Sequence, residues 1–513
     1  MGKLKLALSA FAVVLLAGGY VWQATAADAA LDYLHWPSAN AKYAAIDGRH
    51  IWQNVKEQAG IAEHYRDNGH PQFWGRLAGT SSDVEDTQWL LNKYKQIGLT
   101  DTRIQTINMF NPQWSPRGWT VAATGAGKTV PLASAEPSYG SPDTGGKELN
   151  LEVIYVGLGG EADFAGRDVR GKVVLFVKAQ PSYQAGPADI LKRIEDHGAA
   201  AILSTDMRGG NFNAQSYRAY THVPTFNIGT KDSEALREMI GGASAPPHVR
   251  IRLDANWLPN QKSYLVWGTL PGATDEIIYV IAHRDGFFDA AGDNATGVAT
   301  MLGLAEYFAK IPKGQRRRTM VFIGMDGHHN IKPGGFGREW LVANRDKFFA
   351  KTALMINAEH PAEVLSHGGT AGTTTATVPL EWYAGGSERP KLAKITADAF
   401  HEFGVPVWAA PSEKPPGGDL GRFYWFVPGL VAQSNDFVNM HTAADTPDNV
   451  PWTGLEAITR AYAKIVDQVN MIPLAELQRP ATADPNAPAT PQGYLSLANC
   501  QAWVKDSTAN CVQ

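Results

Sequence analysis

The feature of this sequence that most constrains its fold is a pair of short apolar runs separated by an amphipathic segment. The runs are Ile277–Ala282 and Thr319–Gly324, and Ala299–Ala309 lies between them with apolar residues at helical spacing. A short apolar run bounded by polar residues is typical of a buried strand. Strand, helix and strand in this order predict two strands of an open parallel sheet, joined by a crossover helix.

Each of these two runs ends in side chains that can bind a divalent metal ion. His283, Asp285 and Asp293 follow the first run, and His328 and His329 follow the second. In open α/β sheets, ligands bind in the crevice outside the carboxyl ends of the strands. Imidazole and carboxylate ligands without thiolate suit zinc, or another divalent ion with affinity for imidazole. This edge of the sheet is therefore a candidate metal site.

Two later apolar runs end in the same kinds of side chain. Ala353–Ile356 is followed by Glu359, and Leu430–Ser434 leads to His441. A lone histidine is more often a hydrogen-bonded or surface residue than a ligand, whereas four such strand ends argue against coincidence. Spacing alone leaves a metal site and ordinary polar residues about equally supported.

Composition and charge limit the classes of protein that this chain can belong to. Of its 513 residues 44% are hydrophobic and 19% charged, which is typical of globular proteins. The net charge is −4, and the chain has no long run of Lys and Arg, so we expect no nucleic-acid partner. The two cysteines, Cys500 and Cys511, lie near the C-terminus, and in an exported protein we expect them to form a disulfide rather than stay free.

The N-terminus has the pattern of a signal peptide. Lys3 and Lys5 precede an apolar run that ends at Trp22 and is followed by small residues, which predicts a leader of residues 1–26. We therefore expect a periplasmic or secreted protein without a stable membrane span after cleavage. Because the apolar run is long for a signal peptide, an uncleaved anchor is the alternative.

Beyond the leader, the chain divides into segments of different composition. Residues 123–256 are rich in Gly, Ala and short β-like runs and contain no acid/base cluster, so we interpret them as an inserted module that serves as a structural lid or gate. The remaining predicted segments are residues 27–122 and 257–475, which form the main domain, and a tail of residues 476–513.

Four motifs mark the strand ends described above. They are HRDGFFDAAGDNATG (283–297), RRTMVFIGMDGHH (317–329), INAEH (356–360) and HTAADTPDNV (441–450). In this order they resemble the metal-binding motifs of the cocatalytic zinc aminopeptidases and glutamate carboxypeptidases. The segments DVRGKVVLFVKA and GAAAILSTD resemble the protease-associated domain that is often inserted in these enzymes. The resemblance implies an α/β fold with a mostly parallel central sheet flanked by helices, and a β-rich inserted domain.

The resemblance also implies a role for each candidate residue. One metal ion would be bound by His283, Asp293 and Glu359, and a second by Asp293, His329 and His441. Asp285 would support His283, and His328 stands where the family has its catalytic glutamate, the general base.

Three of these positions depart from the family's pattern. His328 and His329 replace the paired glutamates, and Glu359 replaces an aspartate. His329 and Glu359 can still bind a metal, and the imidazole of His328, with an ordinary pKa of about 6.5, can accept a proton near neutral pH. Losing one negative charge weakens metal retention but makes bound water more acidic. Because residues 330–337 are longer than the family's turn, another register, with His328 as the ligand or a role for Asp326, stays open.

The resemblance as a whole implies an exported metal-dependent hydrolase of peptide or amide bonds, an exopeptidase of the aminopeptidase type. Its substrate would be a peptide or a small amide, and its cofactor a divalent metal, zinc, as one or two ions. Whether the protein forms a homodimer stays open. The alternatives are a noncatalytic metal-binding or scaffold relative, and a single-metal cyclase or transferase on the same fold.

Overall fold

The chain is described by a computed structural model. It covers residues 38–109, 112–125, 127–179, 185–206, 211–217, 219, 221–242, 245–329, 336–363, 378–434 and 438–478. The predicted leader, the two cysteines and most of the loop after His329 lie outside these residues. Residues up to Asp47 form a separate compact unit, whose described part contains the 3-10 helix η1 (Ser38–Tyr43).

The main sheet has seven strands and contains the predicted strand–helix–strand unit. Its strand order is β16-β17-β15-β12-β14-β11-β2. The central strands β17, β15, β12 and β14 are parallel, while β11 and β2 at one edge and β16 at the other are antiparallel. The bounds are β2 (Thr100–Asn108), β11 (Lys262–Leu270), β12 (Thr274–His283), β14 (Arg318–Met325), β15 (Thr352–Ala358), β16 (Glu381–Ala384) and β17 (Gly429–Gln433). The predicted α/β fold is confirmed, with the parallel arrangement at the sheet's centre.

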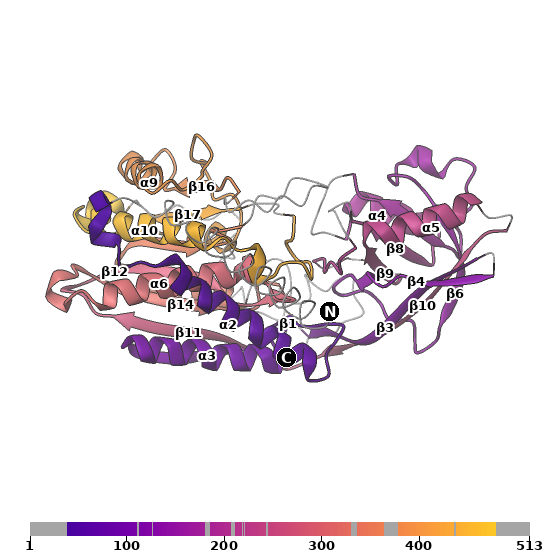
Figure 1. Ribbon diagram of the computed structural model, residues 1–513, viewed down its shortest axis with the longest axis horizontal. Coiled ribbons are helices and arrows are strands. Elements are labelled where there is room, and N and C mark those ends of the chain that lie inside the picture. The colour runs from indigo at the N-terminus through magenta and orange to yellow at the C-terminus, as the bar shows by residue number, and fades with distance from the viewer. Residues whose placement is uncertain are drawn as a thin grey trace, which may run out of the picture. The chain divides into compact units, whose positions relative to one another are not determined.

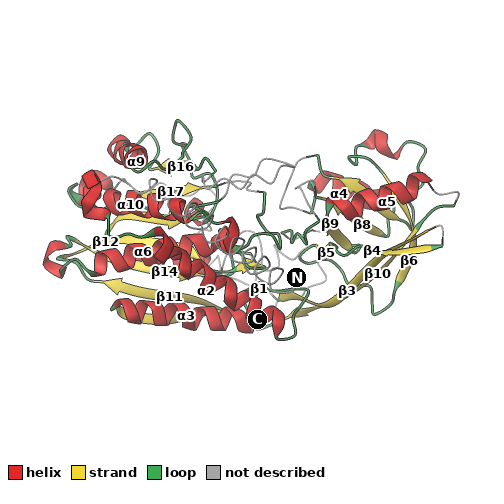
Figure 2. Ribbon diagram, in the orientation of Figure 1, coloured by secondary structure: helices red, strands yellow, loops and turns green. Residues whose placement is uncertain are grey.

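Helices cover both faces of the main sheet, which explains why its central strands are apolar on both sides (Figures 1 and 2). On one face α6 packs against α2, α10 and the sheet, and α3 packs along β11 and β2. On the other face α7 and the segment around Phe423 enclose an apolar core with Trp267 and Tyr279. The helices are α2 (Gly48–Asp67), α3 (Ser81–Ile97), α6 (Thr296–Ala309), α7 (Phe336–Ala343), α8 (Arg345–Phe348), α9 (Pro390–Glu402), α10 (Trp452–Val469) and α11 (Leu474–Leu477).

Short elements connect these helices and strands. Thr80 caps α3 by accepting a hydrogen bond from the Asp83 backbone N–H, and Gly98, with φ 86°, ends it. The short elements are β1 (Gly75–Arg76), β13 (Gly286–Phe287), η3 (Ala291–Ala295), η4 (Lys313–Gln315), η5 (Asp419–Arg422) and η6 (Pro447–Asn449). Strand β1 pairs with β13 next to the first motif, so the N-terminal segment is fixed to that motif.

A second sheet of eight strands forms from the middle of the chain, in the order β4-β3-β10-β6-β7-β8-β9-β5. Strands β6 to β9 are parallel, and β3 and β10 form a long antiparallel pair with its own apolar core. The bounds are β3 (Gln113–Gly125), β4 (Lys128–Pro131), β5 (Glu136–Pro137), β6 (Leu149–Tyr155), η2 (Glu161–Phe164), β7 (Val173–Val177), α4 (Ala188–Asp196), β8 (Ala201–Thr205), β9 (Thr225–Ile228), α5 (Thr230–Gly242) and β10 (His248–Leu258). This sheet therefore starts before residue 123, the predicted start of the insert, because β3 pairs along almost the whole of β10.

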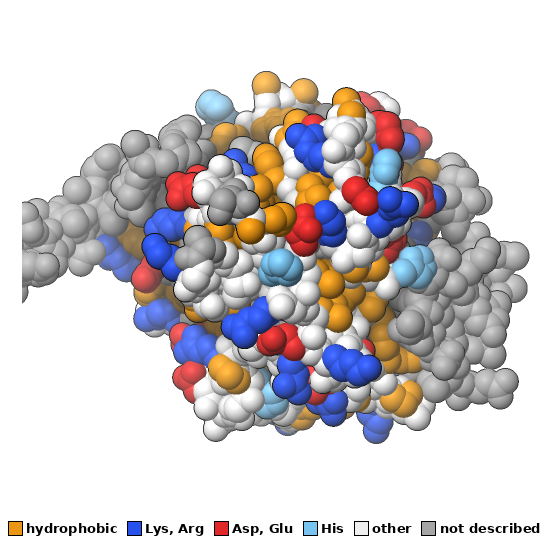
Figure 3. Space-filling model, turned by 90° about the vertical axis from the view of Figure 1, so that its right-hand side faces the viewer, with side chains coloured by type: hydrophobic (Ala, Val, Ile, Leu, Met, Phe, Trp, Pro, Cys, Tyr) orange, Lys and Arg blue, Asp and Glu red, His pale blue; other side chains and the backbone are white. Residues whose placement is uncertain are grey.

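The surface is mixed in charge where it can be seen. On the face drawn in Figure 3, Lys and Arg side chains alternate with Asp and Glu. Among the described helices, none combines the length and the apolar character that a membrane span requires.

Candidate metal centre

The predicted second ligand set comes together at the carboxyl ends of the parallel strands. Nε2 of His329 lies 3.1 Å from Oδ2 of Asp293, and Nε2 of His441 lies 3.0 Å from the same oxygen. The two imidazole nitrogens are 3.2 Å apart. One ligand atom from each of these three buried residues lies within 4.8 Å of the other two, which is the arrangement of a metal site.

The predicted first ligand set also converges, and it contains one residue that the sequence analysis missed. Nε2 of His283 lies 3.2 Å from Oε1 of Glu359 and 3.4 Å from Oδ1 of Asp293. The additional residue is His360, whose Nε2 lies 2.9 Å from the same Asp293 oxygen. His283 therefore belongs to three possible ligand groups: one with Asp293 and His360, one with His328 and Glu359, and one with Asp285 and His329.

Asp293 is held between the two groups by the motif's own amides and by a distant carboxylate. The backbone N–H groups of Gly292 and Asp293 donate to Asp445, at 2.7 and 3.1 Å. The Asn294 side chain accepts from the N–H of His360 at 3.0 Å and donates to the Ala358 carbonyl at 3.0 Å. Each oxygen of Asp293 thus faces a different set of imidazoles, as a bridging carboxylate would.

A glycine in this motif allows the close approach of β15. A Cβ on Gly297 would lie 2.2 Å from the Ala358 carbonyl oxygen, far inside van der Waals contact. The Gly297 N–H also donates to the Asn294 side chain at 3.0 Å. The spacing from Asp293 to Gly297 therefore lets the start of α6 pack directly on the strand that ends at Glu359.

Asp285, the predicted support of His283, contacts the rings of both His283 and His329. Its Oδ2 accepts from the backbone N–H of His329 at 2.8 Å and lies 3.3 Å from Nδ1 of that ring. Its Oδ1 is 3.6 Å from Nδ1 of His283. Burial raises the pKa of Asp285, but the two histidines outweigh it and hold the pKa well below its ordinary value. The carboxylate thus orients the ring of His329, while the Asp285 main-chain carbonyl, 3.1 Å from Nδ1 of His283, orients the ring of His283.

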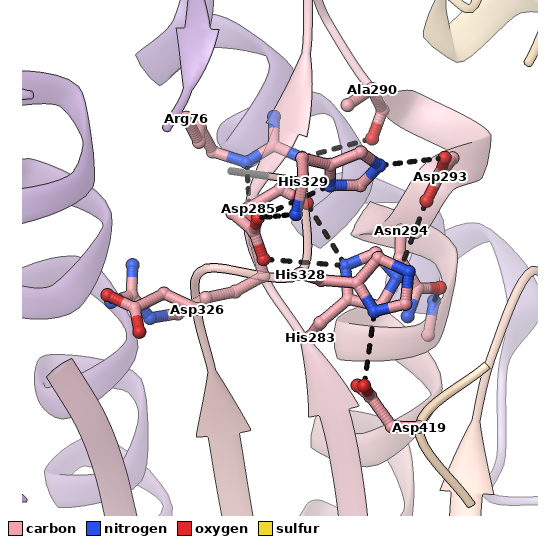
Figure 4. Close-up of polar contacts among 12 residues, drawn as sticks. Arg76, His283, Asp285, Ala290, Asp293, Asn294, Asp326, His328, His329 and Asp419 are labelled. Carbon is pink, nitrogen blue, oxygen red and sulfur yellow. Dashed lines mark hydrogen bonds and ion pairs between the residues drawn. The ribbon is translucent and has the colours of Figure 1, made fainter. Parts of the chain in front are cut away.

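His328 lies at the outer side of the group, where it contacts residues on other segments. Its ring stacks on that of His283, with centroids 4.2 Å apart and planes 14° apart. Nδ1 of His328 is 3.1 Å from Oδ1 of Asp419, which also pairs with Nη1 of Arg338 at 3.3 Å (Figure 4). The His328 side chain is 15% exposed, while that of His329 is fully buried. The sequence analysis missed Asp419, which lies in the loop GGDLGRF.

The alternative register, with His328 as a ligand, stays open in this geometry. His329 lies beside Asp293 and His441, while His328 lies with His283 and Glu359 in another possible ligand group. Figure 4 shows Asp326 on the far side of the loop from the imidazoles, where it accepts from the Tyr264 N–H at 2.7 Å. Asp326 therefore belongs to the support of the strands rather than to the ligand group.

A buried ion cluster supports the carboxyl end of β12. Arg284, between His283 and Asp285 in the chain, is fully buried and lies 2.7 Å from Asp83 and 2.8 Å from Asp86 on α3. Arg76 of β1 donates to the carbonyl oxygens of Arg284 and Asp289, at 2.9 and 2.6 Å. These contacts bind the N-terminal helices to the loop that contains the first two ligands.

The donor atoms fit a divalent cation. Nε2 of His283 and both oxygens of Glu359 are buried, and no described residue forms a hydrogen bond with them. Such atoms cost free energy unless another group satisfies them. Burial lowers the pKa of His329, but Asp293 and Asp285 outweigh it and raise the pKa to about 9. The carboxylates therefore create a place for positive charge, which a cation can fill in place of protons.

Comparisons with known proteins agree with this geometry. Residues 266–466 match the profile of Peptidase family M28. Aminopeptidase YwaD of Bacillus subtilis (strain 168) is 25% identical over 260 residues, which are 48% of this chain and 50% of that protein. The chain thus spans half the length of this curated relative.

Two solved structures show the same fold at low sequence identity. The zinc aminopeptidase BSAP from Bacillus subtilis aligns with a TM-score of 0.57 and 16% identity, over 85% of this chain and 99% of that one. A Peptidase M28 precursor from Shewanella amazonensis SB2B aligns with a TM-score of 0.63 and 16% identity, over 85% and 98%. Every candidate ligand lies within residues 266–466, the part of the chain that matches the profile of Peptidase family M28.

Proposed function

We propose that this protein is an exported, zinc-dependent hydrolase of peptide bonds, an exopeptidase of the aminopeptidase type. The observation that carries the proposal is the position of Asp293, whose two oxygens each lie within 3.1 Å of imidazoles from separate strand ends. The family assignment and the likeness to zinc aminopeptidases support it.

The residues divide into ligands, supports and a base. Zinc bound here would polarise the substrate's carbonyl group and lower the pKa of a water molecule. His283, Glu359 or His360, and Asp293 would hold one ion, and Asp293, His329 and His441 would hold another. Asp285 would fix the ring of His329 with its carboxylate and the ring of His283 with its main-chain carbonyl, so the ligands are oriented before the substrate arrives.

His328 is the proposed general base. Donation from its Nδ1 to Asp419, over 3.1 Å, leaves Nε2 as the acceptor nitrogen. Its partial exposure places that ring where substrate and water can reach it. His328 would take a proton from the attacking water and return it to the leaving amine. A histidine–aspartate pair would thereby replace the family's glutamate.

The proposal is tested by metal analysis together with a panel of aminoacyl and acyl-amide substrates. We expect bound zinc, activity that chelators abolish, and near-total loss of activity in His328→Ala with its zinc content unchanged. His401→Ala, on the exposed side of α9, is the matched control and should keep full activity. Full activity in His328→Ala would remove the base role, and a mass of the exported protein that includes residues 1–26 would contradict leader cleavage.

The replacement of both family glutamates favours a second candidate, a noncatalytic metal-binding relative. It predicts a protein that binds zinc at Asp293 but releases no product from any substrate of the panel. Turnover by the wild-type protein that chelation stops and zinc restores would exclude it.

A further inference from the structure

A segment of the second sheet's domain pairs with the loop that contains the ligand His441. The backbone N–H of Gln215 donates to the His441 carbonyl at 2.9 Å, and that of Ala443 donates to the Asn213 carbonyl at 3.0 Å. Between these two hydrogen bonds, Ala214 and Thr442 form an antiparallel bridge. Residues 213–217, which we call the wall segment, thus lie alongside the metal centre as a short extra strand.

The wall segment is fixed on its other side to the second sheet. The Gln215 side chain donates to the Pro137 carbonyl of β5 at 3.0 Å, and Asn227 of β9 donates to the Ala214 carbonyl at 3.1 Å. Ala214, Gln215 and Ser216 are buried. Because both of its sides are hydrogen-bonded, the segment presents its next residue, Tyr217, in a defined place.

Tyr217 contacts the imidazoles of one ligand group. Its ring centroid lies 6.0 Å from that of His329, with planes 18° apart, and 4.9 Å from that of His441 in an edge-on arrangement. Phe287 contacts the same two rings, at 5.0 and 5.3 Å, but is fully buried. Tyr217 is partly exposed, so of these two aromatic rings it is the one that a substrate can reach.

We propose that Tyr217 is a substrate-contacting residue that the second domain contributes to the active site. Its ring forms an apolar wall beside the His329–His441 group, on which a flat or large apolar side chain of the substrate packs, and it shields both imidazoles from water. The inference rests on the proposed function, because Tyr217 can contact a substrate only if the metal centre beside it binds one. It assigns selectivity for the substrate side chain to a residue outside the metal-binding domain.

The test compares Tyr217→Ala and Tyr217→Phe with Phe212→Ala. Phe212 is a matched control, an aromatic residue next to the wall segment that is 45% exposed. For zinc-loaded protein we expect Tyr217→Ala to raise KM for phenylalanyl and leucyl amides about 3- to 10-fold, the range for one lost aromatic contact, with KM for the alanyl amide and kcat little changed. Tyr217→Phe and Phe212→Ala should match the wild type.

A second measurement does not depend on turnover. We expect a chelator to extract zinc several times faster from Tyr217→Ala than from the wild type, Tyr217→Phe or Phe212→Ala. Wild-type KM ratios together with a wild-type extraction rate in Tyr217→Ala would overturn the inference while leaving the proposed function intact. A zinc-loaded wild-type protein without turnover would refute the proposed function. The extraction rates would then test only whether Tyr217 shields the His329–His441 group. A protein that binds no zinc would end both proposals.

Discussion

Replacing Asp285 by asparagine should weaken zinc binding more than any other change outside the direct ligands. This carboxylate accepts from the backbone N–H of His329 at 2.8 Å and lies within 3.6 Å of Nδ1 atoms on both His329 and His283. Asp285→Asn keeps the size of the side chain but removes its charge. His329 then loses the charged partner that fixes its tautomer and raises its basicity. His283 loses a carboxylate charge 3.6 Å from its Nδ1 but keeps its hydrogen bond to the Asp285 main-chain carbonyl at 3.1 Å.

The size of the effect follows from the number of ligands that Asp285 supports. Removing the partner of one metal-bound histidine typically costs 10- to 100-fold in metal affinity. Because the carboxylate hydrogen-bonds His329 and lies 3.6 Å from Nδ1 of His283, we expect the zinc affinity of Asp285→Asn to fall up to about 100-fold, or about 3 kcal/mol. The loss should be larger for the ion at His329 than for the ion at His283.

Zinc affinity can be measured by competition with a chromogenic chelator, and stoichiometry by elemental analysis. Asp326→Asn is the matched control, because Asp326 is also buried at this sheet edge but pairs with Arg284 and not with an imidazole. It should bind zinc as tightly as the wild type. An Asp285→Asn protein with wild-type affinity and two bound ions would refute the view that this carboxylate orients His329 as a ligand.

Three further changes test how the site is supported. Arg284→Met should lower the free energy of unfolding by about 3–5 kcal/mol, since it leaves Asp83 and its neighbours as buried unpaired carboxylates, and denaturant titration at pH 7 measures it. Burial raises the pKa of Asp83 from 3.8 to about 6 despite Arg284, so the native state binds this proton more tightly than the unfolded state. As the pH rises from about 4 to about 6, the wild type should therefore lose up to about 3 kcal/mol of stability relative to Asp83→Asn. Equal pH profiles of stability for the two proteins would contradict this. Gly418 has φ 64° and ψ −165°, and a Cβ there would lie 2.9 Å from Cδ of Glu359. Gly418→Ala should cost about 1–3 kcal/mol of stability and weaken zinc binding, whereas Gly421→Ala, which meets no neighbouring atom, should do less of both.

The sequence predicted the strand ends well because both signals there are local. An apolar run fixes a central strand, and the polar residue after it must lie at the sheet's carboxyl edge. The five candidate ligands therefore converge as expected, although their spacing in the sequence does not give the distances between their side chains. They are His283, Asp293, His329, Glu359 and His441. The placement of His329 rather than His328 beside Asp293 needed the structure, because the direction in which two adjacent side chains point depends on the turn after β14.

The residues that sequence reasoning missed depend on contacts between distant segments. His360 has a positive φ of 36°, which a strand pattern does not predict, and this turn lies where its ring meets Asp293. Asp419 has a role only because its loop approaches His328, and Tyr217 only because the wall segment pairs with the His441 loop. Each of these contacts joins segments that no local motif links.

The partners of His328 and His329 show how two adjacent histidines are accommodated at this strand end. A histidine that binds a metal through one nitrogen needs a hydrogen-bond acceptor for its second nitrogen, which a carboxylate ligand does not need. His329 finds that acceptor in Asp285, and His328 finds it in Asp419, which Arg338 holds in place. His360 brings another imidazole nitrogen to 2.9 Å from Asp293. Since each of the two adjacent rings has a carboxylate partner on a separate segment, the two histidines are connected to the other candidate ligands.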